Sequence, residues 1–259
     1  MSSNKRSMQQ NVDNMETLTD TVVNFQPAYD PSETRLSIQS QKEIRVKAIE
    51  AISALSDAKR IRNDFISLRT DAFAQLDPVV TRVINALRII NILKQTLDEG
   101  ESIVRELRNK RASEIEPLSK NADGTEKEES PKTNKKRSGS FETRIENFGN
   151  LVKLVTSIEA YKPKEADLTV ESLKTRLDTL IQVNSDAKAA VAKAKAVKEL
   201  RNIVLGADKT GLYDIGMDSK LYVKSAYGAT STQYKSVSGI VFTKMSKGKI
   251  TGKMVVKNA

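Results

Sequence analysis

The chain carries the stretch AYDPSETRLSIQS at residues 28–40 and a close copy of it, AYKPKEADLTVES, at residues 160–172. Alanine, tyrosine, proline, glutamate, leucine and serine recur at matching places in the two copies. Proline cannot continue a helix, and it biases the residue before it away from helical geometry, so each copy predicts a break between two helices. Two such breaks with matching flanks indicate an internal duplication.

The residues that flank the two copies also correspond. Upstream, three pairs match: Asn14 and Asn147, Leu18 and Leu151, Val22 and Val155. Downstream, each copy enters a long helical pattern that reaches an Arg-Asn pair, at residues 62–63 and at residues 201–202. The sequence separation between the two Arg-Asn pairs exceeds that between the two quoted stretches by about seven residues, which is two helical turns. We therefore predict a two-turn insertion that lengthens the second long helix and keeps its buried face.

Helical periodicity predicts the same order of elements in each copy. A short amphipathic helix covers residues 13–24 in the first copy and residues 141–160 in the second, and a long helix follows the proline. Apolar residues at alternating spacings of three and four give each long helix a narrow packing seam. The polar Asn184 in the second seam either fixes helix register or is a tolerated boundary residue. The seams consist of Ile49, Ile52, Leu55, Ala58, Ile61, Phe65 and Leu68, and of Leu173, Leu177, Leu180, Asn184, Ala187, Val191 and Ala194.

Further helices are predicted after each long one. The Asp-Pro pair at residues 77–78 is typical of a helix start, and we expect this helix to continue to a kink at Gly100. In the second copy, residues 206–214 are expected to form a turn before a shorter helix at residues 217–227.

We predict an all-α protein made of two related units of long antiparallel amphipathic helices, a helical bundle. The first unit spans residues 1–112 and the second residues 141–228. Residues 113–140 hold almost no apolar side chains, which predicts a disordered linker. Residues 229–259 are expected to form a basic C-terminal tail, for which a small β hairpin near Lys247 and disorder are both open.

The composition excludes several chemistries. The chain has no cysteine and no histidine, so zinc sites built from those residues, serine–histidine–aspartate triads, cysteine nucleophiles and disulfides are ruled out. Carboxylates alternate with lysine and arginine in helical patterns, as in surface ion pairs. The GKITGK stretch at residues 248–253 lacks the spacing and the hydroxyl residue of a phosphate-binding loop. We therefore expect no enzyme activity, catalytic residue, cofactor or metal.

Two observations bear on location. The first residues, MSSNKRSMQQNVDN, lack the apolar core of a secretory signal. No apolar run approaches the roughly 20 residues that span a bilayer. We therefore expect a cytoplasmic protein without a transmembrane segment.

Positive charge is concentrated at the C-terminus. The formal net charge is +10, and residues 219–259 contain eight lysines and no acidic residue. Lysine attracts phosphate and tyrosine can stack on unpaired bases, so this region is a candidate contact for anions or nucleic acid. A solubilising tail, tyrosines that only pack, and contact with an anionic membrane surface are the alternatives. The candidate residues are Lys220, Tyr222, Lys224, Tyr227, Tyr234, Lys235, Lys244, Lys247, Lys249 and Lys253.

Several stretches resemble a group of bacterial proteins with a duplicated helical body and a shared C-terminal signature. They are Arg201-Asn202, TGLYD at residues 210–214, KLYVKSAYGATSTQYK at residues 220–235, NKRAS at residues 109–113 and the two AYxPxExxL stretches. The chain departs from the pattern of that group at Tyr213, Tyr227 and Thr232, where Val, Phe and Pro are expected. No activity is established for the group, so the resemblance implies the architecture alone.

From these patterns we expect a non-enzymatic structural or protein-interaction protein, with a protein partner or self-association. The alternative is a nucleic-acid-associated protein that binds the phosphate backbone through its Lys/Tyr-rich C-terminal region. Salt distinguishes the two, because contacts to the phosphate backbone weaken steeply as the salt concentration rises.

Overall fold

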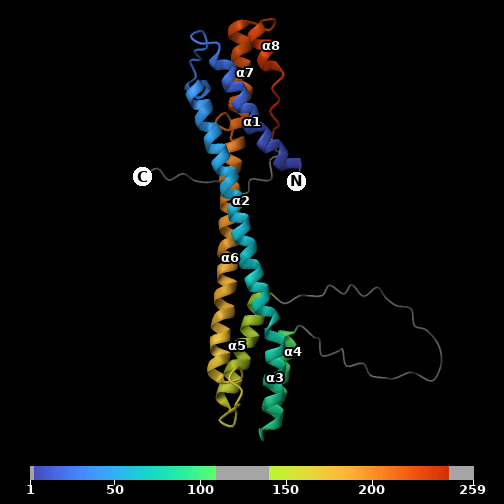
Figure 1. Ribbon diagram of the computed structural model, residues 1–259. Helices are drawn as coiled ribbons and strands as arrows, with labels where there is room; N and C mark the ends of the chain where they lie inside the picture. The colour runs from blue at the N-terminus through green and yellow to red at the C-terminus, as the bar shows by residue number, and fades with distance from the viewer. Residues whose placement is uncertain (1–2, 109–139, 245–259) are drawn as a thin grey trace, which may run out of the picture. The chain divides into compact units, whose positions relative to one another are not determined.

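The computed structural model describes residues 3–108 and 140–244, with side chains from residue 7 onward (Figure 1). Within these ranges the regular structure is helical and contains no strand, which confirms the all-α prediction. The predicted linker, up to residue 139, and the predicted hairpin near Lys247 lie outside the described residues.

The two parts of the sequence contribute helices in a corresponding order. The first part forms α1 (Ser3–Val23), the 3-10 turn η1 (Thr34–Leu36), α2 (Ile38–Ala74), α3 (Leu76–Ile89) and α4 (Lys94–Leu107). The second part forms α5 (Phe141–Ser157), α6 (Val170–Gly206), α7 (Leu212–Tyr227) and α8 (Thr232–Ser238). Each part therefore has a first helix, a long helix and two further helices.

The helices form two compact units that divide the chain differently from the predicted units. Unit 1 contains residues 1–61 and 191–259, whereas unit 2 contains residues 62–190. The physical reason is the length of α2 and α6. Each has 37 residues, and a helix of that length extends about 55 Å, so its two ends cannot share one small core. Each unit consequently combines the start of one copy with the end of the other.

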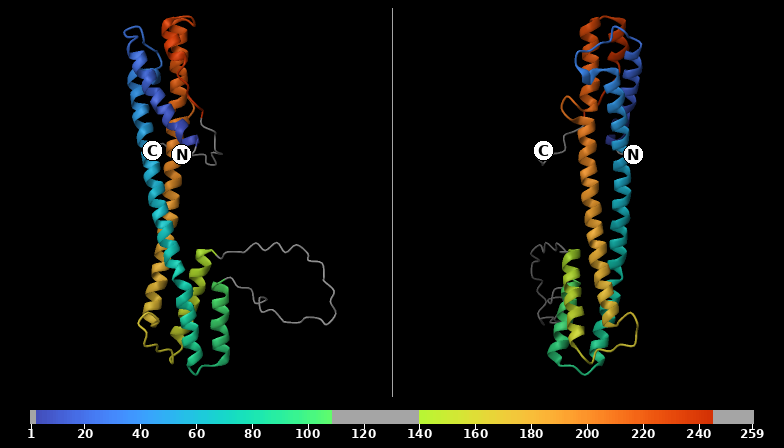
Figure 2. Two further views of the ribbon diagram at one scale, coloured as in Figure 1. Left: turned by 45° about the vertical axis from the view of Figure 1, so that its right-hand side comes forward. Right: turned by 90° about the vertical axis from the view of Figure 1, so that its left-hand side faces the viewer.

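Unit 1 is built from α1, α7, α8 and the adjoining ends of the two long helices (Figure 2). Helix α7 contacts α1, α8 and η1. The predicted basic tail begins within this unit, because α8 and the residues after it, up to Phe242, contribute to its core. The core residues of unit 1 include Val12, Met15, Leu18, Val22, Tyr29, Leu36, Ala48, Leu205, Leu212, Ile215, Val223, Val237 and Phe242.

Unit 2 is built from α3, α4, α5 and the other ends of the long helices, and α4 contacts both α3 and α5 (Figure 2). The chain breaks between Ile89 and Lys94, so the expected single helix with a kink at Gly100 was wrong. Gly100 instead lies inside α4, where an added Cβ would be 3.3 Å from the Leu154 side chain. The core residues include Phe73, Leu76, Val80, Val83, Leu87, Val104, Leu107, Phe148, Leu151, Val152, Val155, Tyr161, Leu168, Leu173 and Leu180.

The predicted two-turn insertion in the second long helix was wrong as well. The helices α2 and α6 have the same length, 37 residues. The difference lies after them, where Gln75 alone separates α2 from α3 but residues 207–211 separate α6 from α7. The two Arg-Asn pairs are therefore not equivalent positions. Counted from the helix starts, Arg69 corresponds to Arg201.

The quoted stretches fold in the same way in both units. The Tyr29 hydroxyl donates to the Leu36 carbonyl at 2.8 Å, and the Tyr161 hydroxyl donates to the Leu168 carbonyl at 2.9 Å. The hydroxyl of Ser37, or of Thr169 in the second copy, accepts a backbone N–H three residues later and caps the long helix. These matched hydrogen bonds support the predicted duplication.

The predicted seams agree with the burial in part. Most of their residues are buried or half-buried, and Asn184 is buried. Ile49, Leu68 and Val191 are exposed instead, and Ala190 is buried next to Val191. A coiled coil between the long helices stays a prediction.

Candidate interaction sites

The interior of unit 1 contains a polar cluster around Gln41, which is fully buried. Its Nε2 donates to the Tyr29 hydroxyl at 2.8 Å, to the Leu36 carbonyl at 2.9 Å and to Ser219 Oγ at 3.2 Å. Its Oε1 accepts from the Thr19 hydroxyl at 3.1 Å. Burial raises the pKa of the Tyr29 hydroxyl. Both ends of the amide are paired inside the unit, so the cluster holds elements together rather than presenting a group to a ligand.

The structure places the first predicted anion-binding lysine in a structural role. Lys220 lies on α7, and its Nζ donates to the carbonyl oxygens of Ser238 and Ile240. Partial burial lowers its pKa. The ammonium group thus connects α7 to the end of α8 and the residues that follow.

The predicted tyrosines make contacts within unit 1. The Tyr222 ring meets the Tyr29 ring edge-on, with centroids 5.2 Å apart. Tyr227 lies 5.7 Å from the Phe25 ring, and burial raises its pKa. Tyr234 lies under the Lys224 ammonium, which is 5.6 Å from its ring centroid. All three tyrosines are half-buried, and these contacts hold the rings in place, as expected of packing residues.

The remaining predicted lysines are not brought together into one site. Lys224 and Lys235 are exposed on α7 and α8. Lys244 is exposed at the end of the described residues, 5.9 Å from the ring centroid of Tyr213. The predicted Lys247, Lys249 and Lys253 lie outside the described residues.

In unit 2, Asn184 connects three helices. Its Oδ1 accepts from Arg69 of α2 at 3.2 Å, and its Nδ2 donates to the Glu142 carboxylate of α5 at 3.2 Å. Lys188 pairs with the same carboxylate at 2.5 Å. The Lys188 hydrogen bond is the main cause that lowers the pKa of Glu142 to about 2. The Arg69 guanidinium also lies 4.1 Å from the centroid of the Phe141 ring. These contacts favour the interpretation that Asn184 fixes the register of the helices over the interpretation that it is a tolerated boundary residue.

A segment that sequence reasoning missed lies after α8 in unit 1. Residues 240–244 are not helical, and their backbone is held by side chains of α1. Asn11 Nδ2 donates to the Thr243 carbonyl at 2.8 Å, and the Thr243 N–H donates to Asn11 Oδ1 at 2.8 Å. Asn14 Nδ2 donates to the Val241 carbonyl at 2.6 Å. No sequence pattern signals this segment, because Gly216 lies just before the predicted helix at residues 217–227 and its close approach to Phe242 is visible only in the structure.

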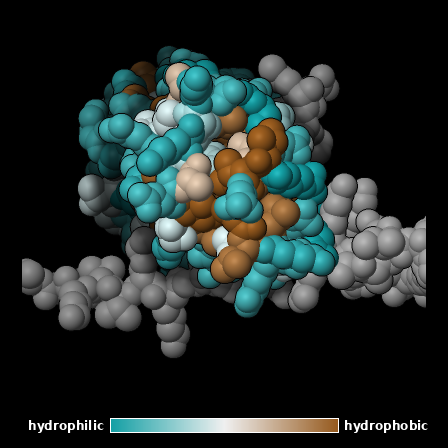
Figure 3. Space-filling view, turned by 90° about the horizontal axis from the view of Figure 1, so that it is seen from below, coloured by the Kyte–Doolittle hydropathy of each residue, from teal (hydrophilic) through white to brown (hydrophobic). Residues whose placement is uncertain are grey.

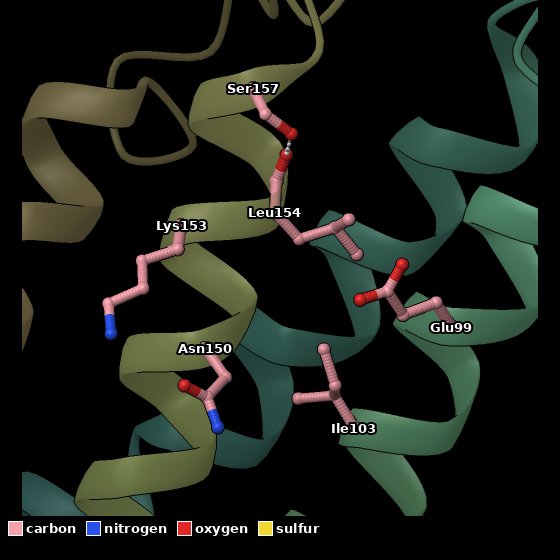
Figure 4. A pocket seen from close by; sticks show the side chains of 6 residues that line it. All are labelled: Glu99, Ile103, Asn150, Lys153, Leu154 and Ser157. Atoms are coloured by element: carbon pink, nitrogen blue, oxygen red, sulfur yellow. Dashed lines mark hydrogen bonds between the residues drawn. The ribbon is translucent and has the colours of Figure 1, made fainter.

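An open groove lies between α4 and α5 in unit 2 (Figure 4). Figure 4 shows Leu154 and Ile103 directed towards each other across it, with Glu99 beside them and the Lys153 side chain pointing away. The groove is wide and exposed, and its walls hold no converging set of polar groups. It lacks the enclosed apolar walls with a few fixed polar groups that are typical of small-molecule sites.

The turn between α3 and α4 carries exposed aliphatic side chains. The sequence RIINIL covers residues 88–93, in which Ile89 is 86% and Leu93 78% exposed. Ile90 and Ile92 are half-buried against the unit 2 core. In the view from below, apolar surface gathers within a polar surround (Figure 3). The sequence predicted one continuous helix through these residues, so they were missed as a surface turn.

The described residues contain no cluster of three or more acidic side chains placed to hold a metal ion. Among the same residues, no helix combines the length and the apolar character needed to cross a membrane. Comparison with models of protein families, with curated proteins and with solved structures gave no match. The resemblance to a bacterial group therefore stays a prediction.

Proposed function

We propose that this chain is a non-enzymatic interaction protein that binds a protein partner through the α3–α4 turn of unit 2. The observation that carries the proposal is the exposure of Ile89 and Leu93 beside half-buried Ile90 and Ile92. Covering an aliphatic side chain of this size contributes about 1.5–3 kcal/mol, so a partner that buries both gains a substantial anchor.

The fold itself does not require these side chains. The corresponding turn of unit 1, between α7 and α8, has the sequence GATS at residues 228–231 and connects its helices without a large apolar residue. Around the α3–α4 turn, Asn91, Lys94 and Gln95 are exposed. An apolar centre with a polar rim of mixed character is the usual anatomy of a protein–protein contact.

Site-specific crosslinking in the cells that make the protein tests the proposal. A photoreactive residue is placed at Ile89 or Leu93, and at Thr230 in the corresponding turn of unit 1 as the matched control. We expect a discrete protein adduct at the first two positions and none at Thr230. An adduct of twice the chain mass identifies a second copy as the partner. Absence of any protein adduct at Ile89 and Leu93 contradicts the proposal.

A double substitution, Ile89→Ser with Leu93→Ser, complements the crosslinking. Both side chains are exposed, so we expect the free energy of unfolding to change by less than about 0.5 kcal/mol. The adduct formed from a third position nearby, Lys94, should disappear in this variant. Persistence of that adduct would show that the aliphatic side chains are not the contact.

Nucleic-acid binding is the second candidate, favoured by the exposure of Lys224, Lys235 and Lys244. A gel-shift series at rising salt tests it, with a chain truncated after Lys244 as the comparison. This truncation spares α7 and α8, which belong to the core of unit 1. If phosphate contacts carry binding, affinity falls steeply with salt and the truncated chain binds more weakly. Absence of binding at low salt rules this candidate out.

A further inference from the structure

The segment after α8 is held mainly through its backbone. Asn11, only 1% exposed, donates to the Thr243 carbonyl and accepts from the Thr243 N–H, both at 2.8 Å. Asn14 donates to the carbonyl of Val241, and Lys220 donates to that of Ile240. Side chains of α1 and α7 thus pair with successive backbone groups of an extended stretch. Such backbone pairing is how proteins bind linear peptides largely independently of peptide sequence.

One side chain of the segment anchors it. Phe242 is 7% exposed, whereas its neighbours Val241 and Thr243 point to solvent. The Phe242 ring lies on Gly216 of α7, where an added Cβ would come within 2.6 Å of the ring. Alternating anchored and exposed side chains, with one aromatic anchor in a fitted pocket, are the usual basis of specificity in peptide recognition.

The corresponding region of unit 2 has no such arrangement. Val80 is the residue of α3 that corresponds to Gly216 of α7, and it fills the space with its own side chain. Arg144 of α5 corresponds to Asn11, and it pairs with Asp77 at 2.9 Å. Helix α4 continues to Leu107 without an extended stretch. Asn14 has a counterpart in Asn147, but Gly216 and Asn11 are replaced in unit 2 by Val80 and Arg144, so the shared fold does not require this glycine and this asparagine.

We propose that the surface formed by α1 and α7 in unit 1 is a binding site for an extended peptide with an aromatic anchor, occupied here by the chain's own residues 239–244. Its ligand in trans is a partner segment with the same pattern, an aliphatic residue two places before a phenylalanine. This site is separate from the α3–α4 turn of unit 2, and the two proposals stand or fall independently.

A truncated chain and a synthetic peptide test the proposal. The chain is ended after Ser238, and a fluorescent peptide with the sequence GIVFTK of residues 239–244 is titrated with it while anisotropy is recorded. The tethered segment competes at an effective concentration on the order of 1 mM, so the truncated chain should bind at least about tenfold more tightly than the full chain. A peptide with Phe242→Ala should bind at least about tenfold more weakly, because the buried ring is lost.

Two substitutions in the truncated chain locate the site. Asn11→Ala removes the paired backbone contacts, and Gly216→Val introduces the side chain that unit 2 carries at the corresponding position. Both should weaken peptide binding, whereas Asn150→Ala on α5 of unit 2 serves as a matched control and should not. The proposal is overturned if the peptide does not bind at concentrations up to about 1 mM, which is the order of the tether's effective concentration. It is also overturned if neither substitution weakens binding.

A second variant keeps the test decisive if the truncated chain does not fold. Phe242→Ala in the full chain removes the anchor and retains the rest of the segment, and circular dichroism reports whether it is helical. A folded Phe242→Ala chain should bind the GIVFTK peptide more tightly than the wild-type chain does. If neither variant folds, residues 239–244 are an indispensable part of the core and the proposal fails.

Discussion

Unit 1 and unit 2 share the hydrogen-bonded turn of the quoted stretches but fill the space next to it differently. In unit 1, Gln41 is the first residue after the repeated stretch, and it bonds with Thr19 and Ser219. In unit 2 the residue at that place is Leu173, also fully buried. Thr19 corresponds to Val152, because each follows one of the matched leucines Leu18 and Leu151. Ser219 corresponds to Val83, because each is the eighth residue of its helix, α7 or α3.

The comparison separates what the two units share from what differs between them. Both units bury the three positions to nearly the same extent, so the framework accepts a polar trio or an apolar trio. A mixture of polar and apolar residues at these three positions is expected to destabilise a unit. A buried amide without hydrogen-bond partners loses its hydration and forms no bond that compensates for the loss.

Separation of the two halves of the sequence is expected to have the largest effect. Each hydrophobic core takes residues from both halves. The Phe73 and Phe141 rings meet edge-on in unit 2, and Leu18 and Leu212 belong to the same core in unit 1. A protease site introduced between residues 113 and 139 should be cleaved without dissociation, so that the two fragments elute together in size-exclusion chromatography. Residues 1–112 and 140–259 made separately should lose most of their helical circular dichroism.

Mixing the two separately made fragments is the control, and it should restore the helical signal. If the cleaved fragments separate and each unfolds cooperatively, each copy is an independent domain. That result would contradict the shared cores.

The second largest effect is expected for Leu173→Gln in unit 2. The new amide can reach the Tyr161 hydroxyl and the Leu168 carbonyl, as Gln41 reaches their counterparts, but Val152 offers its oxygen no donor. We expect a loss of about 2–3 kcal/mol in the free energy of unfolding of unit 2. Hydrogen exchange of peptides from α5 measures it.

Adding Val152→Thr and Val83→Ser to this variant supplies the partners that unit 1 has. The triple variant should therefore be more stable than the sum of its separate substitutions predicts. Strict additivity would show that the hydrogen bonds of the unit 1 cluster cannot be transferred, and that the two units differ by more than these three residues.

Gln41→Leu in unit 1 is the reverse change and should cost less, about 1–2 kcal/mol. Tyr29 keeps its bond to Leu36, and Thr19 keeps its bond to the Met15 carbonyl, so only part of the cluster is left unpaired. Adding Thr19→Val and Ser219→Val creates the apolar trio of unit 2 and should recover most of the loss.

Tyrosine fluorescence in a urea titration follows this change in unit 1. Of the 6 tyrosines, Tyr161 alone lies in unit 2. A triple variant that is less stable than Gln41→Leu would show that the polar cluster is required by the packing of unit 1.

Sequence patterns predicted the long helices and several of the turns because these depend on local chemistry. The proline turns, the turn after Gly206 and the helix end at Gly228 follow from residues close to one another in the chain. The composition of the two units did not follow, because a repeat in sequence says nothing about which ends of two long helices pack together. The resulting error placed the unit boundaries at residues 112 and 141 instead of inside α2 and α6.

The predicted site shows the same limit. Lysine and tyrosine near the C-terminus were read as free contact groups, but Lys220 and Tyr222 are engaged in the packing of α7. Their partners, Ser238 and Tyr29, are remote in sequence, and no sequence motif predicts these contacts. Ile89 and Leu93 were placed inside one continuous helix because periodicity cannot show where a helix ends within an apolar run.

The smallest effect concerns the acid dependence of unit 2. The pKa of Glu142 is lowered from 4.5 to about 2, first by the hydrogen bond from Lys188. A carboxyl group whose pKa is lowered by folding stabilises the folded state above its unfolded pKa, and the stabilisation is lost as the pH falls from about 4.5 towards 2. Unit 1 has Gln9 at the corresponding place in α1, so this source of acid sensitivity belongs to unit 2.

Glu142→Gln tests this point in urea titrations at pH 5, 3.5 and 2, followed by far-ultraviolet circular dichroism. About half of the Glu142 side chain is exposed, and solvent screens the pair, so the substitution should cost well under about 1 kcal/mol at pH 5. The difference between wild type and variant should shrink towards zero at pH 2, and 0.5 M salt should reduce it at pH 5. A difference that stays constant from pH 5 to pH 2 would mean that the Glu142 charge is not what connects α5 to Lys188 and Asn184.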